Sequence, residues 1–167
     1  GGVCTFRNCR AWHNGHATDG TAVGNGNGFK LGGDTAVGDG GHRLERCMAW
    51  ANSGDSGRGF DMNGADNPNT FYNCVAWDND VGFRFLSTGV AHVVRNTIAY
   101  QNGSTYDTLS GIDDAFNTWN VGISDPLFAD TAVSGTFDKP VNDETFLSLA
   151  DGSPCIDAGT DVGLAYE

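Results

Sequence analysis

The chain has 167 residues, enough for one domain with a substantial core, and its formal net charge is −12. This acidity argues against nucleic acid or an anionic membrane as a partner, because both favour basic surfaces, so a polyanionic ligand would need a local cluster of cations or a bridging metal ion. No apolar run is long enough to cross a bilayer, and no signal peptide is recognisable. Five cysteines without a CxxC pair exclude a fully paired disulfide framework and disfavour a zinc site.

In chain order, the first predicted element covers residues 6–14, and its pattern returns at residues 44–52, 71–79 and 94–102. The shared order is apolar, any residue, Asn, Cys, any residue, Ala, aromatic, any residue, Asn, with Arg46 and Thr97 as exceptions. The copies follow one another at spacings of 38, 27 and 23 residues. Repeats of this length are typical of solenoids, and the β-branched and aromatic residues lack a helical period. The sequence therefore predicts an all-β solenoid, in which equivalent strands stack about 4.8 Å apart.

Stacking in register would turn each repeated position into a column of like residues. We expect interior columns of small residues, an aromatic column that packs rather than binds sugar, and a corner column of asparagines that bond to one another. We expect the stacked cysteines to stay reduced, because parallel Cβ vectors hold the sulfurs too far apart for a bridge. These columns are Cys9, Cys47, Cys74 and Thr97; Ala11, Ala49, Ala76 and Ala99; Trp12, Trp50, Trp77 and Tyr100; and Asn14, Asn52, Asn79 and Asn102.

A second motif follows each early copy of the first one. Residues 24–33 read Gly-Asn-Gly-Asn-Gly-Phe-Lys-Leu-Gly-Gly, and the Gly-Phe frame returns at residues 59–62 and 82–85. Side chains alternate along a strand, so the phenylalanines should point inward and the charged residues Lys30, Asp61 and Arg84 outward in one column. Arg84 would then lie roughly 10 Å from Lys30, two strand spacings away.

The repeat weakens towards the C-terminus. Residues 104–125 are predicted to be loop, residues 145–149 a short strand, and residues 152–159 a closing turn. We expect a single domain over residues 1–167, with coils in residues 1–103 and an irregular cap in residues 104–167. Because the chain starts abruptly, with Gly1, Gly2 and Val3 in front of an established pattern, we expect a fragment that lacks upstream coils.

Residues 25–33, the Asn-Cys-x-Ala-Trp repeats and the ending Gly-Ser-Pro-Cys-Ile-Asp-Ala-Gly at residues 152–159 together resemble the pectate lyases of polysaccharide lyase family 9. The resemblance implies a right-handed parallel β-helix that cleaves pectate or polygalacturonate by β-elimination. It implies that Lys30 is the base that takes the C5 proton. It also implies Ca²⁺, whose aspartate cluster would precede the lysine motif by one coil and so lie upstream of this chain. A secreted or cell-surface monomer acting on an acidic polysaccharide is the corresponding expectation.

The residues support this chemistry independently. Proton abstraction next to a carboxylate needs a positioned base, a role that lysine can fill when neutral, and arginine suits bidentate contact with a uronate carboxylate. The candidate substrate-binding residues are Arg84, Asp61 and Asn63. A carboxylate at Asp61 would instead stabilise a charged Lys30, and all three charges could simply form an exposed ladder that aids solubility.

Two other functions stay open on the sequence. One is a non-catalytic β-helix that binds carbohydrate or serves as a surface or adhesion scaffold. The other is a lyase or epimerase acting on a different uronate polymer. Among the histidines, His42 and His92 share a column with Asn69 and are predicted to be structural, whereas His13 and His16 border the long loop before Lys30.

Overall fold

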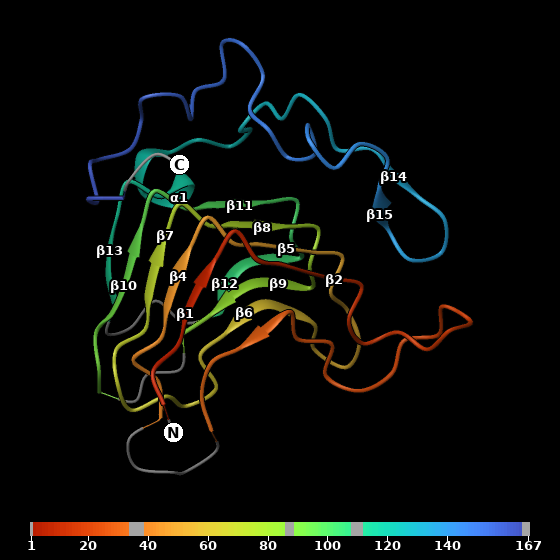
Figure 1. Cartoon of the computed structure of the whole chain (residues 1–167), viewed down its shortest axis with the longest axis horizontal. Helices are drawn as coiled ribbons and strands as arrows, with labels where there is room; N and C mark the ends of the chain where they lie inside the picture. The colour runs from red at the N-terminus through yellow and green to blue at the C-terminus, as the bar shows by residue number, and fades with distance from the viewer. Residues whose placement is uncertain (1, 34–38, 86–88, 108–111, 165–167) are drawn as a thin grey trace.

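The computed structural model describes residues 2–33, 39–85, 89–107 and 112–164, and its strands stack into three parallel sheets (Figure 1). The first sheet contains β1 (Thr5–Arg7), β4 (Arg43–Glu45), β7 (Thr70–Tyr72), β10 (His92–Arg95) and β13 (Ile112–Ala115). The second contains β2 (Arg10–Trp12), β5 (Met48–Trp50), β8 (Val75–Trp77) and β11 (Ile98–Tyr100). The third contains β3 (Phe29–Lys30), β6 (Arg58–Asp61), β9 (Val81–Arg84) and β12 (Ser104–Asp107). The chain visits the three sheets in turn, so the predicted parallel β-helix is confirmed.

The predicted columns are also confirmed by the strand register. In the second sheet each repeated alanine lies beside the next alanine, and the tryptophans pair with one another and then with Tyr100. The alanines lie on the inner side, while Cys47 and Cys74 are fully buried with their thiols near backbone carbonyls. Small residues in these columns let two sheets approach closely at the corner between them.

One residue per coil turns the chain out of the first sheet, into the second sheet in four coils and into α1 (Thr118–Val121) in the last. It has a left-handed backbone, with φ between 52° and 57°, which asparagine tolerates better than most residues. This requirement explains the asparagine before each cysteine, and an arginine occupies the same place in the second coil. The residues are Asn8, Arg46, Asn73, Asn96 and Phe116.

The predicted asparagine column forms a continuous ladder of hydrogen bonds. The Asn14 amide donates to Asn52 Oδ1 (2.8 Å), Asn52 donates to Asn79 Oδ1 (2.8 Å), and Asn79 donates to Asn102 Oδ1 (2.9 Å). The same oxygens accept the backbone N–H of the preceding asparagine, at 3.0 to 3.2 Å. The ladder thereby satisfies buried backbone groups at a corner where the chain leaves the sheet.

Stacked phenylalanine rings fill the interior. Phe29, Phe60 and Phe83 lie over one another with ring centroids 5.1 and 4.8 Å apart, and Phe71 meets Phe60 edge-on from the first sheet. These rings are buried, which fixes the third sheet against the other two and holds β3 in place.

Residues 104–125 differ from the predicted loop. They contain β12 and β13, which pair with β9 and β10, and then the short helix α1 (Thr118–Val121). The sequence motif fades there, but the backbone continues to bond to the preceding coil. Trp119 of α1 packs against Phe83 and Tyr106 and closes the apolar interior at this end.

The C-terminal segment runs over the outer side of the second sheet (Figure 1). It includes the antiparallel pair β14 (Val133–Ser134) and β15 (Lys139–Pro140). The predicted strand at residues 145–149 is wrong: these residues form turns, and Leu149 makes a single antiparallel bridge to Phe128. Their apolar side chains are buried by packing against Trp50 and not by sheet pairing. Turns at residues 152–157 are as predicted. Within the described part of the chain, no helix has the length and apolar character to span a membrane.

Candidate functional site

Lys30 lies on the outer side of the third sheet, in β3. Its neighbours Phe29 and Leu31 are buried, with 9% and 2% of their surface exposed, whereas Lys30 is exposed. This is the predicted alternation. No ion pair shorter than 4.0 Å joins the Lys30 ammonium group to any of the described residues. The side chain is therefore accessible and available to act on a ligand.

The glycines around Lys30 allow β3 to lie against the next coil. A Cβ at Gly28 would lie 2.7 Å from the carbonyl oxygen of Gly59, and a Cβ at Gly32 would lie 2.3 Å from that of Met62. Contacts this short are not tolerated between non-bonded atoms, so only glycine fits. The glycine-rich motif therefore sets the position of the lysine strand on the scaffold.

Lys30, Asp61 and Arg84 form the predicted outward column. The register of the third sheet pairs Lys30 with Asp61 and Asp61 with Arg84. Strand spacing places each pair of Cα atoms about 4.8 Å apart. A linear ligand lying along the stack of strands would meet these three positions in turn.

Asp61 is buried, although the sequence pattern suggested that it could form part of an exposed ladder of charges. Only 1% of it is exposed, because neighbouring side chains cover it. Its carboxylate accepts the Asn63 backbone N–H at 2.9 Å and the Asn27 amide at 3.0 Å. Guanidinium nitrogens of Arg84 and Arg58 lie 3.5 and 3.8 Å away. A bound sugar could reach Asp61 only if these groups moved, so the alternative of a fully exposed charge ladder is wrong at this position.

Asn63 has its functional groups committed to the local turn. It adopts a left-handed backbone with φ of 42°, and its amide donates to the carbonyl of Gly32 at 3.1 Å. This bond joins the turn after β6 to Gly32, two residues after β3. Its direct contact with a substrate stays a prediction, as does that of Arg84.

Asn27 and Arg58 also belong to this site, although the sequence pattern did not point to them. Strict alternation would have placed Arg58 on the inner side, with Phe60. However, both Gly59 and Phe60 face inward, since a Cβ at Gly59 would lie 3.3 Å from the Ala49 Cβ in the core. Arg58 therefore faces outward with Asp61. The repeat offered no signal for this position, because a different residue precedes the glycine in each copy: Asn27, Arg58 and Val81.

Comparison with known proteins agrees with this geometry. A family model described as the Pel9A-like, right-handed beta helix region matches residues 1–120. The chain belongs to this family.

Among its relatives are pectate lyases from bacteria and a fungus. Pectate lyase L of Dickeya chrysanthemi is 32% identical over 167 aligned residues, covering 93% of this chain and 37% of that protein. Pectate lyase PEL9 of Emericella nidulans is 40% identical over 123 residues, covering 70% and 28%. The crystal structure of pectate lyase Pel9A superposes with a TM-score of 0.76 at 30% identity, covering 98% of this chain and 42% of that one. The chain thus spans less than half the length of these relatives. The family match and the superposition also confirm its right-handed parallel β-helix.

The residues beside the lysine of this Pel9A-like chain do not fit a calcium ion. Ca²⁺ takes six to eight oxygen ligands, usually from several carboxylates. Asp61 is the carboxylate paired with Lys30, but its oxygens accept N–H groups and two guanidinium groups lie next to it. No group of three or more potential ligands capable of holding a metal occurs among the described residues. The ligands that the family resemblance implies are therefore not provided by the Lys30 column.

The histidine column of the Pel9A-like helix is structural. His42 Nδ1 accepts the Cys4 backbone N–H at 3.1 Å, Asn69 Oδ1 accepts that of His42 at 2.9 Å, and His92 Nδ1 accepts that of Asn69 at 3.0 Å. Burial lowers the pKa of His92, which keeps this ring neutral and able to accept. The predicted structural role is confirmed for this column.

His13 and His16 stack on each other with centroids 4.0 Å apart. His13 Nδ1 lies 2.7 Å from Asp138 Oδ2, and His16 Nε2 lies 2.6 Å from the Ser53 hydroxyl. The pair therefore links the long loop before Lys30 to both the second coil and the C-terminal segment. This gives it a fastening role in the Pel9A-like fold.

The aromatic column of the Pel9A-like helix packs, as predicted, and does not form an open platform. Trp50 is fully buried and Trp77 is 7% exposed, both beneath Phe146. Only Trp12, at 37%, is substantially exposed. The column therefore serves to hold the C-terminal segment against the second sheet.

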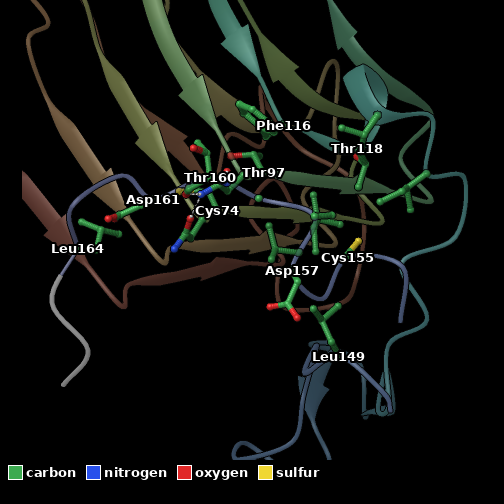
Figure 2. A pocket seen from close by; sticks show the side chains of 18 of the residues that line it. Cys74, Thr97, Phe116, Thr118, Leu149, Cys155, Asp157, Thr160, Asp161 and Leu164 are labelled. Atoms are coloured by element: carbon green, nitrogen blue, oxygen red, sulfur yellow. Dashed lines mark hydrogen bonds between the residues drawn. The ribbon is translucent and has the colours of Figure 1, made fainter. Parts of the chain in front are cut away.

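A cavity of about 1020 Å³ lies between the coils and the C-terminal segment. Figure 2 shows Asp157 and Leu149 of that segment on one side and the coil residues Phe116 and Thr118 on the other. No residue of the Lys30 column lines it. The candidate site is therefore the open outer side of the third sheet, and this cavity is separate from it.

Proposed function

We propose that the protein containing this chain is a lyase that cleaves pectate or a related polyuronate by β-elimination, with Lys30 as the base. The observation that carries the proposal is the exposed Lys30 on a rigid outer strand, in the family whose named members are pectate lyases. The open sheet face suits a long polymer better than a small, enclosed ligand.

In the proposed reaction, neutral Lys30 Nζ takes the proton from C5, next to the uronate carboxylate. The electron pair left on C5 forms a C4–C5 double bond, the bond between C4 and its glycosidic oxygen breaks, and the departing oxygen takes a proton from water. Arg84 would hold a uronate carboxylate of the same polymer. We derive no step through calcium, because the residues around Lys30 do not fit that ion. A monomer secreted or held at the cell surface is part of the proposal, since its polymeric substrate lies outside the cell.

A non-catalytic carbohydrate-binding β-helix is the second candidate. It is favoured by the carboxylate of Asp61 directly beside Lys30 in the register, because a negative charge there competes with an acidic substrate for the lysine. Against this, two arginines also lie against the same carboxylate and offset its charge.

The test uses the full-length protein, polygalacturonate and the ultraviolet absorbance of the unsaturated product. We expect Lys30→Ala to lower kcat by roughly 10²- to 10⁴-fold, the usual contribution of a general base. Lys139→Ala is the matched control, because Lys139 is exposed and lies in β15 of the C-terminal segment. It should leave kcat within about twofold of the parent value, as expected for surface substitutions remote from a site.

Full activity in Lys30→Ala would end the assignment of the base. Binding of polygalacturonate without any unsaturated product from the parent protein would favour the non-catalytic candidate.

A further inference from the structure

We infer that Arg58 and Arg84 form a carboxylate-binding subsite beside Lys30, which takes a uronate group of the polymer, and that Asp61 is its positioning residue. The inference rests on the proposed function for the identity of the polymer. It differs from the sequence prediction in adding Arg58 and in giving Asp61 an indirect role.

The first support is a set of buried polar atoms without partners. Nε of Arg58, Nε of Arg84 and Oδ1 of Asn27 are each inaccessible and make no hydrogen bond to the described residues. An unpaired buried donor on a charged group is costly, and such groups in native proteins call for an explanation. Five such atoms occur among the described residues, the other two being Nε2 of His13 and of His92, and these three belong to side chains that contact Asp61. Two unused guanidinium donors are what a carboxylate ligand requires, and because both are covered in this structure, the ligand would reach them as the side chains around them move aside.

Glu45 provides an internal comparison for Asp61. It is also buried, at 2% exposure, and it also has two arginines, Arg7 and Arg43. There, however, both Nε atoms bond directly to the carboxylate, that of Arg7 at 2.7 Å. A buried carboxylate in this fold can therefore saturate two arginines. The arginines around Asp61 stay at 3.5 and 3.8 Å, which leaves them available to another anion.

The charges in this part of the sheet favour an anion. Arg58, Arg84 and Lys30 place three positive charges on this side of the sheet, next to Asp61 and Asp107. These cations gather in a chain whose formal net charge is −12. Such a cluster is the feature that a polyanionic ligand needs on an acidic protein.

Asp107 is the competitor that a ligand would displace. Its Oδ2 lies 3.9 Å from Arg84 Nε, which is too far for a hydrogen bond, and 51% of its side chain is exposed. An exposed pair at this distance contributes little, so the loss on displacement is small.

Asp61 holds both guanidinium groups in one place. The NH1 atoms of Arg58 and Arg84 lie against the same oxygen, Oδ2, and the Asn27 amide and Asn63 N–H fix the carboxylate. The two cations would otherwise repel each other and extend into solvent. Asp61 therefore acts on the ligand through the arginines.

The experiment measures binding of polygalacturonate to the full-length protein by calorimetry, together with KM and kcat. Arg58→Gln and Arg84→Gln should each weaken binding about tenfold, the usual effect of losing one hydrogen bond to a charged group. Methyl-esterified polymer, which lacks the carboxylate charge, should bind equally to the parent protein and to both variants. Arg43→Gln is the matched control, since Arg43 serves Glu45, and it should leave binding of polygalacturonate within twofold.

Asp61→Asn distinguishes a positioning role of Asp61 from simple repulsion of the polyanion, because the two predict opposite changes in binding affinity. Removing a negative charge should tighten binding of a polyanion if Asp61 merely repels it. We expect the opposite, a roughly fivefold higher KM with kcat within twofold, because the arginines lose their anchor. Tighter binding in Asp61→Asn would overturn the positioning role. Unchanged binding in Arg58→Gln, or equal losses for the esterified polymer, would overturn the subsite.

Failure of the proposed function gives a different result. If the parent protein makes no unsaturated product, calorimetry still tests the arginine subsite. If the parent cleaves the polymer and both arginine variants bind as the parent does, the lyase assignment stands and the subsite falls.

Discussion

The asparagine ladder allows one substitution to be worked through in detail, Asn79→Ala. Asn79 is 3% exposed, and its Oδ1 accepts both the backbone N–H and the amide of Asn52, at 3.2 and 2.8 Å. Its own amide donates to the carbonyl of Ala49 at 3.0 Å and to Asn102 at 2.9 Å. The alanine variant would leave the buried Asn52 N–H unpaired, at a cost of about 1–3 kcal/mol, and remove further bonds worth about 0.5–1.5 kcal/mol each.

We therefore expect Asn79→Ala to lower the free energy of unfolding by about 3 kcal/mol. For a chain of this size, this corresponds to a fall in Tm of roughly 6–12 °C. Urea unfolding followed by tryptophan fluorescence measures the first quantity, and a thermal melt measures the second.

Asn14→Ala is the matched control at the exposed end of the same ladder. Asn14 donates one side-chain bond to Asn52, and its substitution should cost no more than about 1 kcal/mol. Equal losses for Asn14→Ala and Asn79→Ala would refute the argument, because the ladder would then stabilise the fold by something other than satisfying buried groups.

Two further predictions concern packing and pH. Trp50→Ala should cost about 3–5 kcal/mol and make the C-terminal segment sensitive to protease, whereas Trp12→Ala should cost much less because Trp12 is 37% exposed. Burial would raise the pKa of Glu45, but hydrogen bonds and charge from Arg7 and Arg43 outweigh it and hold that pKa below its ordinary 4.5. The stability that Glu45 contributes is therefore complete above about pH 4.5 and is lost as the pH falls through the lower pKa of the folded protein. Between about pH 5 and pH 3, the free energy of unfolding should therefore fall less in Glu45→Gln than in the parent protein. Urea titrations at each pH measure this difference.

Much of the scaffold could be derived from the repeats alone. Parallel coils bring equivalent residues side by side, so a repeated alanine, tryptophan or asparagine must become a column whatever the loops between the copies do. The same reasoning placed Lys30 outward, since Phe29 and Leu31 are apolar and strand side chains alternate. The columns and the orientation of Lys30 needed no knowledge of distant contacts.

The later part of the chain was harder to derive. Strands β12 and β13 carry few of the repeated residues, yet their backbones bond to β9 and β10. Backbone pairing depends weakly on side-chain identity, so a coil can continue after its sequence motif has faded. The turns at residues 145–149 resembled a strand because the same apolar residues can be buried by either arrangement.

The amino-acid order thus dictated which residues stack and on which side of the third sheet Lys30 lies. A periodic pattern suffices for this, because equivalent residues of successive coils are neighbours at a constant spacing. It could not dictate that Asp61 is covered, that Arg58 shares its side of the sheet, or that the C-terminal segment lies over Trp50. Those outcomes depend on a local departure from alternation at Gly59 and on contacts between segments that share no repeat. Only the packed tertiary structure, in which each buried group must find a partner, decided them.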